Sequence, residues 1–295
     1  MLLTQKLEEI SCSSRDAQKT ISEYLLKEKE HIGRKSMQQI AEETFSSKAT
    51  LVRFAKKLGF AGWNEFQAEF LQETRYLELH KENVNVNKPF QIGSSPLEIA
   101  GSLVAVKRDC LDQTLEMLNE ETLEKCVDAM QAARRICLFG ISVNEYLLRV
   151  FMHHMFLIGR IVEIVNPIEA RYIAESMDDK DCAIVVSYSG NDPDRNPTHL
   201  VPTLKEHGSV IIGLTSMGTN MLRDYADYTL TIASREKIYS KIGAFSTETS
   251  TLFLLDLLFS CYFERNYDKN LEYKYAMMRR VETKRYSTTQ GIRED

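Results

Sequence analysis

Three polar corners in the second half of the chain carry residue types that bind anions. Each directly follows a short apolar run, and they read FGISVN (139–144), SYSGND (187–192) and LTSMGTN (214–220). Glycine lets the backbone approach a ligand closely, while hydroxyls and helix N-terminal N–H groups donate hydrogen bonds to an anion. One such corner alone is ordinary turn chemistry, but three together predict a pocket for a small polar ligand. The predicted ligand-binding residues are Gly140, Ser142, Asn144, Ser187, Ser189, Gly190, Asp192, Thr215, Ser216 and Glu248.

Asp192 places a fixed negative charge in the second corner. Two charges about 4 Å apart interact by a few kcal/mol at an effective dielectric near 20, so a carboxylate here repels phosphate. Three alternatives remain open. A phosphosugar binds with Asp192 turned away; or the ligand lacks phosphate, or carries an amine or free hydroxyls that bond to Asp192; or the pocket has lost its ligand and serves oligomerisation only.

The apolar runs before these corners predict a parallel β-sheet. They are continuous and β-branched, and helix-period segments lie between most of them, which is typical of a sheet covered on both faces. Ligands of such sheets bind at the carboxyl ends of the strands. We therefore predict a three-layer α/β domain over residues 97–265, closed by a long buried helix at 245–264. The predicted strands are 135–139, 160–165, 181–187, 209–215 and 228–233.

The first 77 residues predict an all-α domain, with a linker at 78–96. Two short helices at 36–43 and 46–59 are separated by a tight break, as in a helix-turn-helix whose second helix lies in the major groove of DNA. Alternatively, this is a helical dimerisation cap whose basic residues are only solvated. The predicted base contacts are Ser47, Lys48, Ala49, Thr50 and Arg53, and the predicted phosphate contacts are Ser36, Lys56 and Lys57.

The charge of the chain is divided between the two parts. The net charge is −5, yet residues 34–57 hold six basic side chains against two acidic ones, while residues 97–265 hold 16 basic against 24 acidic ones. A small basic patch before an acidic body is consistent with DNA binding by the first part. Residues 266–295 are predicted to be a frayed C-terminal tail.

Several classes of protein do not fit the composition. No apolar run reaches 18 residues, so we expect no membrane span, and no signal peptide is evident at the start. The six cysteines never show C-x-x-C spacing and no histidines lie at metal-ligand spacing, so we expect buried thiols in the cytoplasm, no metal and no cofactor.

The segment SMQQIAEETFSSKATLVRFAKKLGFAGWNEFQ (36–67) resembles the helix-turn-helix of the RpiR/MurR family of bacterial transcription regulators. RRICLFGIS, VVSYSGND and VIIGLTS similarly resemble the SIS (sugar isomerase) domain that follows it in that family. The resemblance implies that the second domain senses a phosphosugar and tunes binding to operator DNA. Three departures stand out. Phe45 replaces a frequent glycine, Ser142 and Asn144 alter a G-x-G-x-S turn, and Asp192 replaces the threonine of S-x-S-G-x-T.

Two other classes of protein remain as alternatives to a regulator. A sugar-phosphate isomerase needs a base within reach of its substrate, and only Glu248, His153 and His154 are candidates, each with a simpler structural role. A purely structural dimerisation module would need neither ligand nor DNA. We predict no catalytic residue, and we expect a homodimer or homotetramer because one helix-turn-helix makes too few contacts for specific binding. The helices at 96–118 and 245–264 are candidate oligomer surfaces.

Overall fold

The N-terminal part of the chain is all helical, as predicted. The computed structural model describes residues 3–13, 16–29, 31–79, 84–192, 194 and 196–282. The helices of this part are α1 (Leu3–Ser13), α2 (Ala17–Glu28), the short 3-10 helix η1 (Ile32–Arg34), α3 (Met37–Glu43), α4 (Lys48–Lys57) and α5 (Trp63–Leu79).

Side-chain caps set where the helices of this domain begin. Ser36 and Gln39 form a capping box at the start of α3, and the Ser47 hydroxyl accepts the backbone N–H of Thr50 at the start of α4. Between the caps, apolar residues at helical spacing turn inward to one core. Its largest side chains include Phe66 and Phe70, whose rings stack with centroids 5.9 Å apart.

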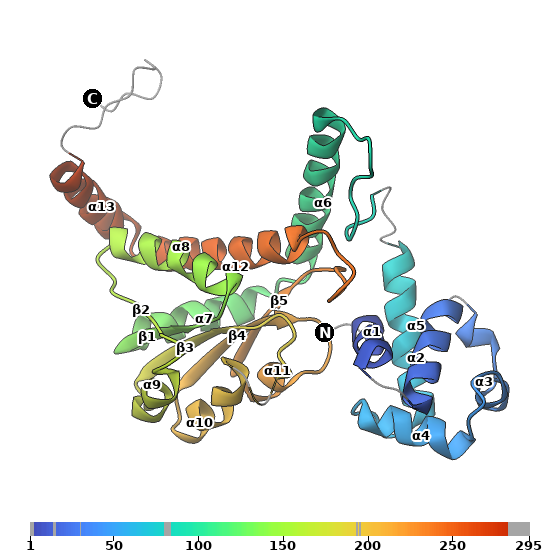
Figure 1. The fold of residues 1–295 in the computed structure, drawn as a ribbon. Helices are drawn as coiled ribbons and strands as arrows, with labels where there is room; N and C mark the ends of the chain where they lie inside the picture. Colours follow the sequence, from blue (N-terminus) through green and yellow to red (C-terminus); the bar gives the residue numbers. More distant parts are fainter. Residues whose placement is uncertain are drawn as a thin grey trace.

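The second part of the chain is a three-layer α/β domain that follows a helical arm (Figure 1). Its helices and turns are α6 (Pro96–Glu116), α7 (Glu120–Ala132), α8 (Val143–Leu157), α9 (Ala170–Ser176), η2 (Thr198–Leu200), α10 (Val201–Glu206), α11 (Met221–Tyr225), α12 (Phe245–Glu264) and α13 (Tyr267–Val281). Its strands are β1 (Arg135–Phe139), β2 (Glu163–Ile164), β3 (Asp181–Val186), β4 (Val210–Ser216) and β5 (Tyr228–Ile232).

The five strands form one parallel sheet in the order β2-β1-β3-β4-β5. Alternate residues of each strand face opposite sides. Ile136 and Leu138 join a core with α7, α8 and α12, while Cys137 and Phe139 join a second core with α9, α10 and α11. The predicted fold class, an all-α domain followed by a three-layer parallel-sheet domain, is therefore confirmed.

Two local predictions were wrong. The predicted strand at 160–165 is only the two-residue edge strand β2, which pairs with β1 alone. The tail predicted to fray forms the helix α13, because Tyr273 packs onto Gly159 at the end of α8 and Asn270 donates to the carbonyl of Phe263. Residues 283–295 lie outside the described part of the chain. The predicted domain boundaries at 77, 96 and 265 stay predictions.

Candidate functional site

Apart from Ser36, the N-cap of α3, the residues predicted to contact DNA belong to α4 and its N-cap Ser47. Ser36, Ser47, Lys48, Ala49, Arg53, Lys56 and Lys57 are exposed, and Thr50 is half-buried. On the opposite side of α4, Leu51, Phe54 and Ala55 are buried in the core. One face of α4 therefore anchors the helix and the other is free to enter a groove.

Hydrogen bonds order the first turn of α4. The Ser47 hydroxyl lies 2.9 Å from that of Thr50, and Arg53 donates to the Thr50 hydroxyl at 3.3 Å. Two lysines of the basic patch have partners within the domain: Lys35 pairs with Glu43 at 2.6 Å, which raises the pKa of Lys35, and Lys57 donates to Gln18 at 2.6 Å.

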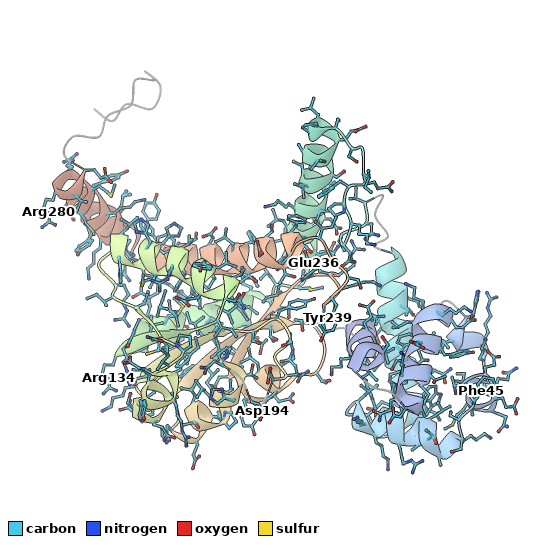
Figure 2. The ribbon with its side chains drawn as sticks, in the orientation of Figure 1. Phe45, Arg134, Asp194, Glu236, Tyr239 and Arg280 are labelled. Carbon is cyan, nitrogen blue, oxygen red and sulfur yellow. The ribbon has the colours of Figure 1, made fainter. Side chains whose placement is uncertain are left out.

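The turn between α3 and α4 has a conformation that normally takes glycine. The N–H of Ser46 donates to the carbonyl of Ala41 at 2.8 Å and that of Phe45 to Glu42 at 3.1 Å, which together form a Schellman motif. Phe45 consequently has φ of 52° and is 95% exposed, projecting at the outer edge of the domain (Figure 2). A bulky side chain in this region costs about 1–3 kcal/mol of strain.

The first two polar corners meet at the switch point of the sheet. The chain leaves β1 toward β2 on one side and runs from β3 to β5 on the other, which opens a crevice at the carboxyl ends of β1 and β3. Across it, the side-chain amide of Asn144 donates to the carbonyl of Val186 at 3.3 Å. Ser187 accepts the N–H of Gly190 at 3.3 Å, so the second corner curls back on itself.

The third corner supports the second from beneath. Gly190 has φ of 62°, and a Cβ there would lie 2.3 Å from Oδ1 of Asn220 and 2.7 Å from Oγ1 of Thr215. The Thr215 hydroxyl donates to the carbonyl of Tyr188 at 3.3 Å. Ser216 is buried, and its hydroxyl has no hydrogen-bond partner among the described residues. Thr215 and Ser216 thus lie behind the second corner (187–192), which is called the ligand corner below.

Ser142 adopts a strained backbone at the start of α8. Its φ is 56° and its ψ is −131°, its side chain is exposed, and it makes no capping hydrogen bond. Ser142 and Phe45 both depart from the family turns, and both have a strained backbone. They are the only non-glycine residues with positive φ in the described part of the chain.

We expect Ser142→Gly to raise the free energy of unfolding by about 1 kcal/mol, because relief of strain exceeds the extra entropy of glycine in the unfolded chain. Chemical denaturation measures this change. Ser240→Gly, at an exposed loop serine without positive φ, is the matched control and should lower stability slightly. Equal changes in both variants would contradict the strain at Ser142.

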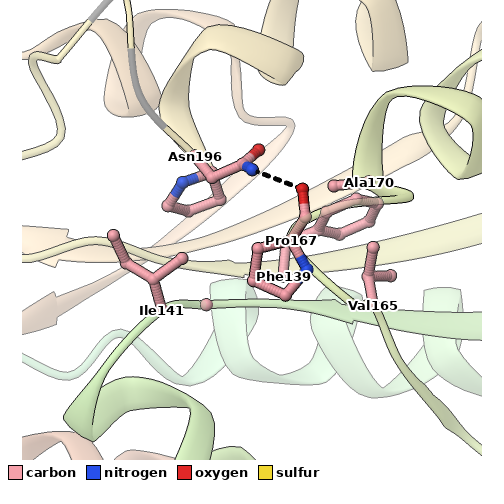
Figure 3. Close-up of a pocket in the computed structure, with 8 residues that line it drawn as sticks. Phe139, Ile141, Val165, Pro167, Ala170 and Asn196 are labelled. Atoms are coloured by element: carbon pink, nitrogen blue, oxygen red, sulfur yellow. Dashed lines mark hydrogen bonds between the residues drawn. The ribbon is translucent and has the colours of Figure 1, made fainter.

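A small pocket lies at the carboxyl end of β1 (Figure 3). Its volume is about 10 Å³, and the amide of Asn196 closes one side by donating to the carbonyl of Pro167 at 2.9 Å. No motif in the sequence points to Asn196, because its partner lies in a different loop. The residues lining the pocket are Phe139, Gly140, Ile141, Val165, Pro167, Ala170, Asn196 and Pro197.

A larger hollow of about 390 Å³ lies between α7 and α12, away from the three corners. Glu120, Glu124 and Glu264 surround it, while its one arginine, Arg265, pairs with Asp128 at 3.1 Å. This acidic lining disfavours an anion, so the smaller pocket at the strand ends is the better candidate for the ligand site.

Asp192 lies half-buried at the edge of the ligand corner. Its carboxylate accepts the N–H of Asp194 at 3.2 Å, so two acidic residues occupy neighbouring positions in this loop. Glu248 lies half-buried in the first turn of α12. Of the predicted ligand-binding residues, only Gly140 lines the small pocket, and neither Asp192 nor Glu248 does.

The predicted catalytic candidates are spread over the domain. His153 lies ten residues beyond the start of α8, which is about 15 Å along the helix. His154 packs on Phe259 with ring centroids 5.0 Å apart, and its Nδ1 lies 3.7 Å from Asp256. Neither histidine belongs to the pocket. Among the described residues, no group of three or more His, Cys, Asp or Glu side chains could hold a metal ion.

Glu236 is a buried carboxylate that the sequence analysis missed (Figure 2). It accepts the N–H of Ser246 at 2.6 Å and the hydroxyl of Thr247 at 2.7 Å, and it pairs with Lys241 at 3.1 Å. These bonds fasten the loop between β5 and α12 to the start of α12. Tyr188 in the ligand corner donates to the carbonyl of Ser234 in the same loop at 3.0 Å, so the two are linked.

Two loops at the carboxyl edge of the sheet contact the N-terminal part of the chain. Lys6 of α1 donates to the carbonyl of Thr219 at 2.8 Å, and Glu8 of α1 pairs with Lys237 at 2.8 Å. Asn87 accepts the N–H groups of Lys237 at 2.6 Å and Ile242 at 2.9 Å. The helical domain thus touches the loops that follow β4 and β5.

Comparisons with known proteins match both parts of the chain. The model of the rpiR-family helix-turn-helix domain matches residues 1–75, and the model of the SIS domain matches residues 129–261. An uncharacterized HTH-type transcriptional regulator of Clostridium perfringens is 29% identical over 93% of this chain and 96% of its own length. Another from Haemophilus influenzae is 26% identical over 83% of this chain and 84% of its own.

Solved structures share the fold, one over nearly the whole chain and one over the second domain. The Vibrio vulnificus NanR protein complexed with ManNAc-6P has a TM-score of 0.58 at 18% identity, covering 95% of this chain and 97% of that one. The sugar isomerase domain of an RpiR transcription factor from Sphaerobacter thermophilus has a TM-score of 0.52 at 19% identity, covering 61% of this chain and 98% of that one.

The chain is a transcription regulator in which a helix-turn-helix domain precedes a SIS domain. Its helix-turn-helix domain belongs to the rpiR family. The isomerase alternative loses support, because relatives that span both domains are named as regulators. Within the described residues, no helix is both long and apolar enough to cross a membrane.

Proposed function

We propose that this regulator binds operator DNA through α4 and responds to a sugar or sugar phosphate at the switch point of its sheet. It acts in the cytoplasm. The observation that carries the proposal is the pairing of an exposed basic helix with a polar crevice in one chain. NanR, whose structure holds ManNAc-6P, shares the fold and supports a phosphorylated sugar as the class of ligand.

On the DNA side, Ser47, Lys48, Ala49, Thr50 and Arg53 face the bases. Ala49 and the Thr50 methyl suit a thymine methyl, and Arg53 or Lys48 suits a guanine or a phosphate. Ser36, Lys56 and Lys57 face the sugar–phosphate backbone, which fixes the register of the helix but carries no sequence information.

On the ligand side, direct contacts come from the corners after β1 and β3. Ser187, Ser189 and Asn144 supply side-chain donors, while Gly140 and Ser142 bring the N-terminus of α8 to the crevice. Thr215 and Ser216 hold the second corner from beneath, and Glu248 lies at the edge. Because ligand pockets usually measure about 300–1,000 Å³, a pocket of about 10 Å³ must widen greatly to enclose a sugar.

Ligand binding changes the position of the DNA-binding domain through the loops after β4 and β5. Widening the pocket moves the ligand corner, which rests on Thr215 and Asn220 and bonds to Ser234. The same two loops hold α1 through Lys6 and Glu8. Exposed contacts of this kind contribute about 0–1 kcal/mol each, so the coupling is a modest shift in the position of the domain.

The functional unit is a homodimer or homotetramer. Two helix-turn-helix domains read two half-sites, and their spacing then depends on how the protomers pack. Leu97 and Val104 of α6 are exposed, which supports this arm as an oligomer surface together with α12.

We expect the Lys48→Ala, Arg53→Ala double variant to bind at least about tenfold more weakly to duplex DNA selected by the wild-type protein from a random pool. Fluorescence anisotropy at several salt concentrations measures both the affinity and its salt dependence. Adding a sugar phosphate that raises the unfolding temperature of the wild type should change its affinity for the same duplex.

Lys125→Ala, which removes an exposed lysine paired with Glu121 on the SIS domain, is the matched control and should leave DNA binding unchanged. Unchanged affinity in the double variant would refute α4 as the reading helix. Identical affinities with and without every stabilising sugar phosphate would refute the sensing role.

A further inference from the structure

The exposed phenylalanine in the turn before α4 has no structural role that explains it. The Schellman motif fixes a left-handed backbone at Phe45, a conformation that glycine adopts without strain. The side chain is 95% exposed and does not belong to the core cluster of the domain. Among the residues that the structure describes, Phe45 therefore adds strain and exposes apolar surface without a compensating contact.

The surroundings of Phe45 indicate what covers it. It lies two residues before Ser47, the N-cap of α4, at the end of the helix that carries the proposed base contacts. Lys48 and Arg53 are exposed nearby and give this end a positive charge. An apolar side chain beside exposed cations fits DNA, because the major groove presents phosphates along its edges and thymine methyl groups on its floor.

We propose that Phe45 is a specificity-determining residue that contacts thymine methyl groups in the major groove, next to the bases read by α4. This rests on the proposed DNA-binding function. The phenyl ring adds the turn before α4 to the surface that contacts bases. The protein therefore contacts at least one base pair beyond those that α4 itself reaches. Glycine at this position would keep the backbone and lose the contact.

The test uses the full-length protein and a duplex that the wild type enriches from random-sequence DNA. Phe45→Gly should raise the unfolding temperature, since it relieves strain, yet weaken binding to that duplex about tenfold. Replacing single thymines by deoxyuridine removes one methyl group at a time. At the contacted positions this should weaken binding by the wild type and leave binding by the Phe45→Gly variant unchanged.

Ile161→Ala is the matched control, because Ile161 is also exposed and apolar but lies in the SIS domain. It should alter neither affinity nor the response to deoxyuridine. Unchanged DNA affinity of the Phe45→Gly variant would overturn the proposal. A change in oligomeric mass as the only effect would also overturn it, because it would show that a second copy of the chain covers Phe45. Failure of α4 as the reading helix is distinguishable, because the Lys48→Ala, Arg53→Ala variant would then bind as tightly as the wild type.

Discussion

Gly190→Ala is expected to lower the free energy of unfolding by about 3 kcal/mol and to abolish stabilisation by any sugar phosphate. A methyl group at this position meets Oδ1 of Asn220 at 2.3 Å and Oγ1 of Thr215 at 2.7 Å, in a backbone conformation that disfavours a side chain. Neither neighbour can move freely, because Asn220 caps α11 by accepting the N–H of Arg223 and Thr215 bonds to Tyr188. Chemical denaturation and thermal shift measure the two losses.

Gly93→Ala separates the collision from the backbone strain. Gly93 also has a positive φ, of 88°, but nothing lies within 4 Å of the point that a Cβ would occupy, so alanine there costs only about 1 kcal/mol. The excess loss at Gly190 then reports the contact between the second and third corners. Equal losses of unfolding free energy in the two variants would contradict the close packing of Gly190 against Asn220 and Thr215.

The parts of the fold that sequence predicts are those fixed by local chemistry. Ser36 predicts the start of a helix because a hydroxyl at the N-cap bonds to an N–H two or three residues away, and this cap forms. The strands at 135–139 and 181–186 are recognisable because both faces of a covered parallel sheet are apolar. The edge strand β2, which pairs with β1 alone, is shorter than the strand predicted at 160–165.

What the sequence could not predict depends on partners far along the chain. The helix α13 is polar by composition and is held where Tyr273 meets Gly159, more than a hundred residues earlier. In the sequence, nothing distinguishes Glu236 from a surface glutamate. Its burial depends on residues at the start of α12 that pack around it. The ligand corner was visible as a motif, but the position of Thr215 beneath Gly190 follows only from the neighbouring strands.

Asp192→Thr is expected to raise the affinity for hexose 6-phosphates by at least about tenfold. Two unit charges about 8 Å apart interact by about 2 kcal/mol at an effective dielectric near 20, and partial exposure of Asp192 reduces this. Calorimetry with a panel of hexose and hexosamine 6-phosphates and their unphosphorylated parents measures the change. Asp192→Asn removes the same charge without adding a hydroxyl, and Asp194→Asn removes an exposed charge two residues away.

The three ligand alternatives give different results in this series. If Asp192 repels phosphate, both Asp192 variants gain affinity for the phosphorylated sugars, more than Asp194→Asn does, and the gain shrinks with salt. If the carboxylate is turned away from a bound phosphosugar, wild type and variants bind it alike. If Asp192 accepts hydroxyls or an amine, both variants lose the unphosphorylated sugars. If the pocket binds no ligand, none of the titrations shows binding, and the Asp192 carboxylate then has no role in sensing.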